Sequence, residues 1–483
     1  MWIPSLATMA AMLFLATGEE PENPWKEKVA AAVRHAEADP TAAALRAALD
    51  TCWRADDWAA GLRLAERVRE KHPDDGELRG LAARALWRGG RLADAERLAE
   101  RLPLRTADTV GCRLQIAIHL SRGEPAEAEE WAQRLERLGP KTADDYYHVF
   151  AVRFSAGKLA GLADLVRKAE RLASPKNGYP ETCLPESIEG VAAFLDAVGP
   201  QPLNQIAQYG AAPLTPLVLF NLPACDVLID GHGPYRMVVD TGGSIMVALD
   251  QTLADELGLK SVAQASVRGV SGKQATGQVL VDELRIGTIV GRRVMTRTFD
   301  VRGAIMNAAD GIIGTGIFAQ GRMTLDWAGG QLVVSRSRDE SGAGTAAELR
   351  LVGDAKLMVP ALLEGGPAVS LLDTGADVIA LAPSCLRRLF PDREVKTFSP
   401  GVGLGVGAGQ QTEISLGSGA RLVLAGRTFE NYGGLGLDAL DKTLSPLLGV
   451  QIDALLGMPM FRQMKSVTVD FPKCKLWVEW LER

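Results

Sequence analysis

Two patterns of hydrophobic residues divide the chain. In residues 1–200, apolar residues recur at helical spacing, as in Glu96-Arg-Leu-Ala-Glu-Arg-Leu102, which is typical of amphipathic helices. In residues 201–483, Val- and Ile-containing runs lie between glycine-rich segments, which favours strands and tight turns. Of the 51 glycines, 14 lie in the first 200 residues and 37 in the rest. The sequence therefore predicts a helical region followed by a β-rich region, joined within the Pro-rich stretch Ser174–Pro216 around one short apolar helix near Ile188–Val198.

The helical region contains a repeat. Gly90-Arg-Leu-Ala-Asp-Ala95 recurs as Gly123-Glu-Pro-Ala-Glu-Ala128 and, more loosely, at Gly157–Leu162, and Asp56–Gly61 fits the same frame at spacings of 34, 33 and 34 residues. This period is typical of stacked helix pairs. Residues 40–172 resemble a tetratricopeptide array, although most of that family's aromatic positions and its closing proline are absent. Such arrays often hold a peptide or protein partner; the alternative is a spacer that supports the neighbouring domain.

The β-rich region contains a second duplication, which carries an aspartate. Tyr235-Arg-Met-Val-Val-Asp-Thr-Gly-Gly-Ser244 and Val369-Ser-Leu-Leu-Asp-Thr-Gly-Ala-Asp377 each place Asp-Thr-Gly after an apolar run, with Gly-Pro beginning seven residues before the aspartate. Further along the chain, the matched segments are Asp310–Phe318 with Asp453–Phe461, and Met323–Asp326 with Val467–Asp470. Two matched series predict two lobes of one architecture, joined through Ser335–Ala347.

These paired motifs resemble the aspartic proteases of the pepsin and retroviral-protease superfamily, over about residues 216–483. The resemblance implies a bilobal all-β fold behind the helical array, with Asp240 and Asp373 as the catalytic pair. It also implies that the active-site loops are supported by four further residues, among which the threonine hydroxyls tie one loop to the other: Thr241, Gly242, Thr374 and Gly375.

Two adjacent carboxyl groups explain the expected chemistry. Like charges within hydrogen-bond reach cannot both ionise easily, so the pair shares one proton. The ionised carboxylate takes a proton from a water molecule, and the protonated one donates a hydrogen bond to the substrate carbonyl. No metal or other cofactor is required. Because both motifs lie on one chain, we expect the active site to be complete in a monomer.

Substrate contacts are expected from a mobile hairpin and from the residues that follow the motifs. Arg268–Gly277 is the candidate hairpin of the first lobe, and Gly401–Gly409 is its counterpart in the second. No tyrosine lies between Val262 and Ile286, unlike in pepsins, which favours the retropepsin-like bacterial type. Asp377 is expected to bind the substrate backbone; the alternative is an ion pair with Arg387 or Arg388. The expected substrate-binding residues are Ser244, Asp377, Gly269, Val270 and Ser271.

Composition excludes several other classes of protein. The formal net charge of −6, without a basic block, argues against nucleic-acid binding. The six cysteines are isolated and no Cys/His zinc spacing occurs, so we expect no metal site. The apolar run Leu6–Thr17 is too short to span a bilayer and is similar to a signal peptide ending near residue 18, although it lacks a positive n-region. This favours an exported, periplasmic or secreted protein over a cytoplasmic one; the alternative is a frayed or buried first helix. No later segment predicts a membrane helix.

The sequence thus predicts a multidomain α and β protein. The expected parts are a candidate signal peptide (1–18), a tetratricopeptide-like repeat domain (25–200), a linker (201–215) and two protease lobes (216–337 and 348–483). The expected function is an aspartic endopeptidase acting on peptide or protein substrates. The alternatives are an inactive peptide-binding scaffold on the same fold, and a protease that acts only on its own Pro-rich junction.

Overall fold

The computed structural model describes residues 25–482 except 103–107, 174–189, 219–220, 244–246, 270–271, 340, 353–355, 392–395, 403–410 and 417–418. It divides into a helical unit, Glu19–Pro200 with Ser445–Gln451, and a β unit, mainly Gln201–Leu444 with Ile452–Arg483. A segment from near the C-terminal end of the chain is therefore grouped with the helices. Within the helical unit, its Gln451 N–H donates to the Arg88 carbonyl at 2.8 Å.

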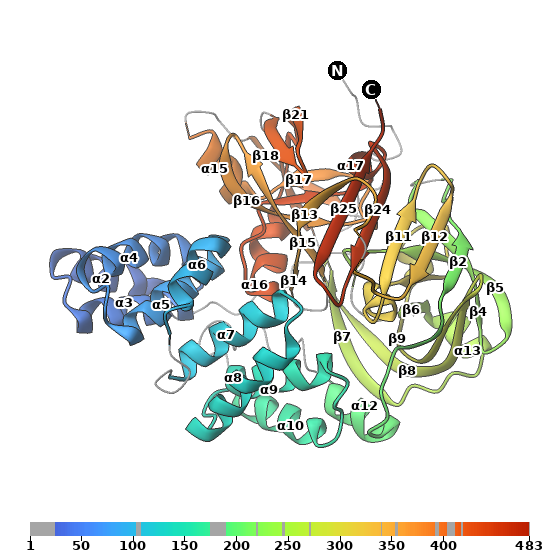
Figure 1. Ribbon diagram of the computed structural model, residues 1–483, viewed down its shortest axis with the longest axis horizontal. Helices are drawn as coiled ribbons and strands as arrows, with labels where there is room; N and C mark the ends of the chain where they lie inside the picture. Colours follow the sequence, from blue (N-terminus) through green and yellow to red (C-terminus); the bar gives the residue numbers. More distant parts are fainter. Residues whose placement is uncertain are drawn as a thin grey trace. The chain divides into compact units, whose positions relative to one another are not determined.

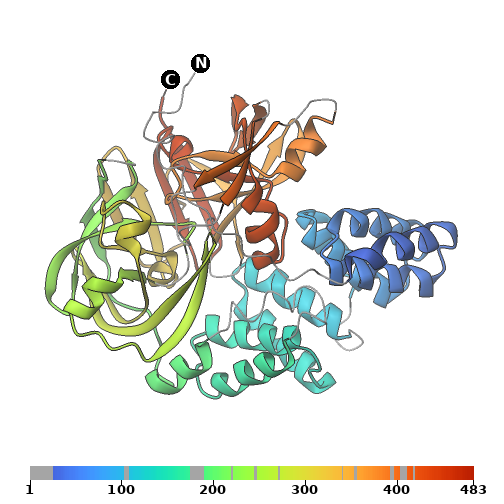
Figure 2. The same ribbon diagram turned by 180° about the vertical axis from the view of Figure 1, so that it is seen from behind.

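The helical unit is built from consecutive antiparallel helices (Figures 1 and 2). They are α2 (Lys26–Ala38), α3 (Ala42–Ala55), α4 (Trp58–Lys71), α5 (Gly76–Arg88), α6 (Leu92–Ala99), α7 (Thr109–Ser121), α8 (Pro125–Leu138), α9 (Ala143–Ser155), α10 (Leu162–Leu172), α12 (Val191–Val198) and the short α16 (Ser445–Leu448). The four copies of the sequence repeat begin in the turns that precede α4, α6, α8 and α10. The period near 34 therefore marks one helix pair, as the sequence predicts.

Small and aliphatic side chains fill the space between successive helices. Around α7, α8 and α9 the buried cluster comprises Cys112, Ile116, Ala128, Trp131, Ala132, Leu135, Val149 and Val152. Polar caps end the helices locally: Thr142 and Asp145 form a reciprocal capping box at the start of α9. The amphipathic pattern of this region thus becomes a continuous core between stacked helices.

Three sheets make up the β unit. The first-lobe sheet contains β1 (Gln205–Gln208), β3 (Thr215–Pro216), β4 (Pro223–Ile229), β5 (His232–Val239), β6 (Val247–Asp250), β7 (Ala263–Gly269), β8 (Gly272–Ile286), β9 (Ile289–Phe299) and β10 (Gly311–Ile313). The second-lobe sheet contains β14 (Arg350–Val352), β15 (Lys356–Leu363), β16 (Gly366–Leu372), β17 (Ile379–Leu381), β18 (Lys396–Val402), β19 (Gln411–Leu416), β20 (Ala420–Leu424), β21 (Arg427–Tyr432), β22 (Leu435–Leu437) and β23 (Ala454–Leu456). A third sheet contains β2 (Gly210–Pro213), β11 (Arg322–Asp326), β12 (Gln331–Ser335), β13 (Thr345–Glu348), β24 (Met464–Asp470) and β25 (Lys475–Trp480).

Short helices connect these strands. They are α13 (Gln251–Glu256), α14 (Val301–Ala304), the 3₁₀ helix η2 (Thr315–Phe318), α15 (Pro383–Leu389), the π-helix η3 (Leu440–Leu444) and α17 (Met458–Phe461).

The two lobes repeat the same strand arrangement. In the first lobe, β10 runs parallel to β5 and antiparallel to β6; in the second, β23 runs parallel to β16 and antiparallel to β17. Each hairpin that leads to an Asp-Thr-Gly motif turns through two residues of positive φ, Asp230-Gly231 in one lobe and Glu364-Gly365 in the other. Two-residue hairpin turns of type I′ require positive φ at both of these positions. The sequence duplication is therefore a structural one.

The third sheet joins the lobes through the second pair of matched segments. Strand β11 of the first lobe lies antiparallel to β24 of the second (Figure 1), and Thr324 is directly opposite Thr468 with their hydroxyls 2.9 Å apart. The pairs on either side of it, Met323 with Val469 and Leu325 with Val467, are buried. The two copies of one sequence motif thus pair with each other at the join.

Residues 201–215 differ from the predicted linker. Strand β1 pairs with β9 of the first-lobe sheet, and β2 pairs with β12 of the third sheet. Ala212 on β2 is buried opposite Leu332. These residues form strands because the sheets offer unpaired edges, which a short polar sequence does not reveal.

The candidate signal peptide, residues 1–18, lies outside the described residues, and the expectation of export stays a prediction. Within the part of the chain that the structure describes, every helix is too short or too polar to cross a membrane.

The role of β1 and β2 gives a prediction about truncation. A chain beginning at Leu214 should be less stable than one beginning at Gln201, by more than about 2 kcal/mol, because it loses two strands and each lost hydrogen bond contributes roughly 0.5–1.5 kcal/mol. Denaturant unfolding of the two truncated chains measures the difference. Equal stabilities would mean that 201–213 is a linker after all.

Candidate active site

Each Asp-Thr-Gly motif follows the end of a buried strand. Asp240 follows β5, and its backbone N–H donates to the Ile313 carbonyl of β10 at 3.0 Å. Asp373 follows β16, and its N–H donates to the Leu456 carbonyl of β23 at 3.1 Å. The matched segments Ile312–Gly314 and Leu455–Gly457 therefore each hold the backbone of one motif aspartate by a hydrogen bond.

The two threonines lock the active-site loops together. The Thr241 N–H donates to the Thr374 hydroxyl oxygen at 3.0 Å, and the Thr374 N–H donates to the Thr241 hydroxyl oxygen at 3.1 Å. Each hydroxyl then donates across the join, Thr241 to the Leu372 carbonyl at 2.9 Å and Thr374 to the Val239 carbonyl at 2.6 Å. Both threonines are buried. Four hydrogen bonds thus fix the loops to each other, so the lobes cannot separate here without leaving buried polar groups unpaired.

The glycines of the motifs make room for the opposite carboxyl group. A Cβ atom on Gly242 would lie less than 3 Å from the Asp373 carboxyl group, and one on Gly375 less than 3 Å from that of Asp240. Any larger residue would collide with the aspartate of the other loop. The third motif residue must therefore be glycine because each aspartate packs against the other loop.

Backbone donors hold the carboxyl groups in place. Asp240 Oδ1 accepts from the N–H groups of Gly242 and Gly243 at 2.9 and 2.8 Å, and Asp373 Oδ1 accepts from the Gly375 N–H at 2.8 Å. Both aspartates are only partly buried, so each keeps some surface in contact with solvent.

The pKa of Asp373 is raised well above its ordinary value. Burial is the largest cause, and the charge of Asp240 and a hydrogen bond to its carboxyl group add to it. The Gly375 N–H and the charge of Lys356 oppose the rise in this pKa. A carboxyl group whose pKa is raised by burial and by a neighbouring carboxylate keeps its proton to higher pH than an isolated aspartate does.

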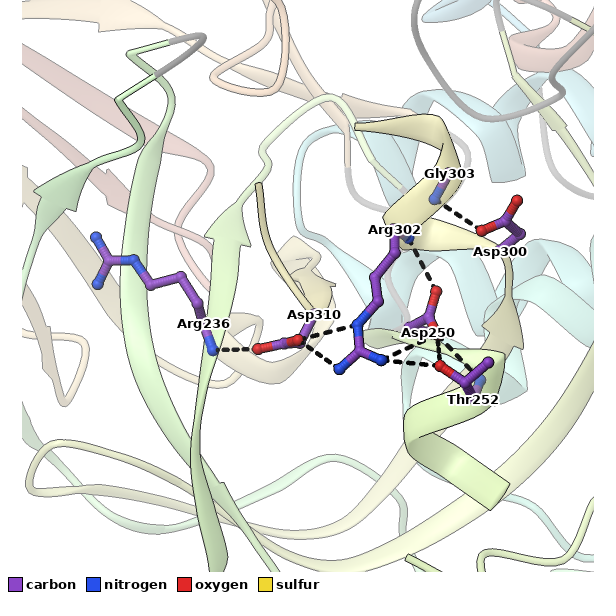
Figure 3. Close-up of polar contacts among 7 residues, drawn as sticks. All are labelled: Arg236, Asp250, Thr252, Asp300, Arg302, Gly303 and Asp310. Carbon is purple, nitrogen blue, oxygen red and sulfur yellow. Dashed lines mark hydrogen bonds and ion pairs between the residues drawn. The ribbon is translucent and has the colours of Figure 1, made fainter. Parts of the chain in front are cut away.

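A network of polar contacts braces the strand that leads to Asp240 (Figure 3). Asp310, just before β10, accepts from the Arg236 N–H of β5 at 2.9 Å and from two nitrogens of Arg302 at 3.1 and 2.7 Å. Arg302 also donates to the Thr252 hydroxyl at 2.9 Å, and its backbone N–H donates to Asp250 at 2.9 Å. Asp310 thus fixes β5 to β10 at Arg236, four residues before Asp240.

The second lobe repeats this brace. Asp453 accepts from the Val369 N–H of β16 at 3.0 Å, again four residues before the motif aspartate, and from Arg388 at 2.8 Å. Asp310 and Asp453 are the first residues of the matched downstream segments. Both residues therefore hold the strand that leads to a motif aspartate. From the sequence alone, they were visible only as matching positions in the two copies.

The structure describes only part of the expected substrate-binding residues. Strands β7 and β8 form a hairpin in which Gly269 pairs with Gly272, within the predicted first-lobe hairpin Arg268–Gly277. Val270, Ser271 and Ser244 lie outside the described residues. In the second lobe, β18 and β19 form the corresponding hairpin, but residues 403–410 lie outside the described range.

Asp377 is exposed and forms an ion pair with Arg462 at 2.6 Å. The alternative partners considered from the sequence were wrong: Arg388 instead binds Asp453. The sequence suggested partners close to Asp377 along the chain, whereas Arg462 is 85 residues away.

Sequence reasoning missed one residue of the site altogether. Lys356, at the start of β15, is buried and donates to the carbonyl oxygens of Gly242 at 3.0 Å and Gly243 at 2.6 Å. The two Asp-Thr-Gly motifs could have been aligned further toward the N-terminus, beyond the Gly-Pro that precedes each motif. Lys356 would then have appeared as the one charged residue in an apolar strand.

Comparisons with known proteins agree with this architecture. Residues 225–317 match the aspartyl protease family, and residues 53–110 match the tetratricopeptide repeat family. A search among curated proteins finds no match to this sequence. Among solved structures, a retropepsin-like aspartic protease from Rickettsia conorii is similar at 13% identity and a TM-score of 0.20, covering 27% of this chain and 95% of that one. Separate parts of the chain thus match the tetratricopeptide repeat family and the aspartyl protease family.

The loop lock gives a prediction about stability. Thr374→Val keeps the shape of the side chain but leaves the Thr241 N–H and the Val239 carbonyl without their partner. The free energy of unfolding should fall by about 2–4 kcal/mol, since each buried group left unpaired costs roughly 1–3 kcal/mol. Thr374→Ser, which retains the hydroxyl, is the matched control. Denaturant unfolding should rank Val well below Ser; equal stabilities would contradict the lock.

The raised pKa of Asp373 gives a prediction about pH. Above the ordinary carboxyl pKa and up to the raised one, the folded chain binds more protons than the unfolded chain, so stability falls as pH rises. Asp373→Asn removes this loss. Its stability relative to wild type should therefore increase from about pH 4 upward and level off above the raised pKa. A pH-independent difference in unfolding free energy would contradict the shift.

Proposed function

We propose that the chain is an aspartic endopeptidase that hydrolyses peptide bonds through a water molecule held between Asp240 and Asp373. One observation carries the proposal: two hydrogen-bonded loops bring two partly buried carboxyl groups together, each against the glycine of the other loop. The match of residues 225–317 to the aspartyl protease family supports the same conclusion.

The mechanism follows from the shared proton. The ionised carboxylate accepts a proton from water as the water oxygen bonds to the peptide carbon, and the protonated carboxyl gives its proton to the carbonyl oxygen. The resulting diol collapses when the C–N bond breaks, with the amine nitrogen taking a proton from the pair. The raised pKa of Asp373 favours a pair that keeps one proton in the free enzyme. No covalent intermediate with the protein is formed.

Substrate binding is assigned to the rim of this site. The residues from Gly269 to Ser271 are proposed to cover a bound peptide, and Ser244 and Asp377 to bind its backbone. The exposed carboxylate of Asp377, oriented by Arg462, has free hydrogen-bond capacity for a peptide N–H. The helical repeats are proposed to bind a protein partner, in keeping with the match of residues 53–110 to the tetratricopeptide family.

The proposal is tested first by substituting the pair. Asp240→Asn and Asp373→Asn should each lower kcat/KM on peptide substrates by at least about 10²–10⁴-fold, the usual contribution of general acid–base catalysis. Asp255→Asn, at an exposed position on α13, is the control and should leave activity unchanged. Wild-type activity should follow a bell-shaped pH profile, because only the singly protonated pair is competent. Either site variant cleaving at the wild-type rate would refute the assignment, and complete inactivity of the wild type would favour the scaffold alternative.

A mixing experiment tests whether one chain completes the site. Equimolar Asp240→Asn and Asp373→Asn variants should remain inactive together, since each chain contributes both loops to its own site. Peptidase assays of the mixture over a range of concentrations provide the measurement. Activity that appears on mixing would mean that the site forms between two chains, each supplying one intact aspartate.

A further inference from the structure

A buried lysine reaches across the join between the lobes. Lys356 is 7% exposed and begins β15 in the second lobe. Its Nζ atom donates to the carbonyl oxygens of Gly242 and Gly243, at 3.0 and 2.6 Å, in the loop that follows Asp240. The lysine therefore fixes the first-lobe loop from the opposite lobe, as the threonine lock does, but with a charged group.

This contact breaks the symmetry of the two lobes. Strands β15 and β16 are antiparallel, and Met358 pairs with Leu371. If this pairing is continued by two residues toward the start of β15, Lys356 lies opposite Asp373. In the first lobe Ala224 pairs with Val238, and the same continuation sets Leu222 opposite Asp240. Leu222 is buried and apolar. At equivalent positions, one lobe thus presents a cation beside its aspartate and the other a hydrocarbon.

The positive charge of Lys356 is offset by a negatively charged group nearby. Among the described residues, the ion pairs found do not include Lys356, and a buried ammonium without compensation is costly. The acidic group on which it acts is Asp373, which also faces Asp240. Strands β10 and β23, which lie beside the two motif strands, contribute only glycine, alanine, isoleucine and leucine. A singly protonated pair carries one negative charge, which Lys356 balances.

We propose that Lys356 is a positioning residue that holds the Asp240 loop against the second lobe and keeps the aspartate pair singly charged. It touches neither the scissile bond nor the water, and it acts through the loop carbonyls and through its charge. Its effect on catalysis rests on the proposed function, whereas its effect on the charge of the pair does not.

The catalytic test compares pH profiles. Lys356→Met removes the charge and the donor, and Lys356→Gln removes the charge but keeps a donor. Because an opposite charge within a few ångströms lowers a carboxyl pKa by roughly 1–3 units, both limbs of the kcat/KM profile should move to higher pH by about that amount in both variants. Lys356→Arg should keep the wild-type limbs with a lower kcat. Lys465→Met, at an exposed position, is the control. Unmoved limbs in the Met and Gln variants would overturn the proposal.

A second readout does not require activity. Removing the charge of Lys356 should raise the pKa of the pair further, so the unfolding free energy of Lys356→Gln should go on falling to higher pH than that of wild type. In the Asp373→Asn background the same substitution should have no pH-dependent effect. Parallel stability curves in the wild-type background would overturn the proposal. If Lys356→Met fails to fold, Lys356→Gln carries both tests. If wild type cleaves no peptide, the proposed function fails and the stability curves still decide the role of Lys356.

Discussion

The structure depends on one constraint: two loops from different lobes must approach closely enough for their aspartates to face each other. The reciprocal hydrogen bonds of Thr241 and Thr374 meet this constraint, and Gly242 and Gly375 provide the space for it. The paired strands behind each loop, braced by Asp310 and Asp453, bring the loops to the join. The pairing of β11 with β24 joins the same two lobes through a second repeated segment.

Close approach of two carboxyl groups is unfavourable in itself, and the surroundings offset that cost in different ways. Backbone N–H groups donate to Oδ1 of each aspartate, and Lys356 brings a positive charge to the loop that follows Asp240. In the proposed mechanism, a shared proton removes one of the two negative charges. The pKa of Asp373 stays raised despite these contributions, since burial and the charge of Asp240 outweigh them. Under the proposed function, a proton retained between the two aspartates relieves their repulsion, and the proposed reaction uses this proton.

Features that occur twice in the sequence could be predicted from it, whereas contacts between distant segments that occur once could not. The duplicated motifs predicted Asp240, Asp373 and the supporting Thr and Gly residues, and the period near 34 predicted the helix pairs. Strands β1 and β2 were missed because their partners, on β9 and β12, lie about a hundred residues further along the chain. The same holds for Lys356, whose carbonyl partner Gly242 is 114 residues away. The grouping of Ser445–Gln451 with the helices likewise carries no local signal.

The central claim is that the interlocked loops of one chain create a coupled pair of carboxyl groups. Carboxyl ¹³C NMR of the full chain with labelled aspartate, assigned with Asp240→Asn and Asp373→Asn, measures this directly. The account predicts two titration steps that are widely separated, with each signal responding to both steps and the upper step well above the ordinary aspartate range near pH 4. Two independent titrations close to pH 4 would contradict it.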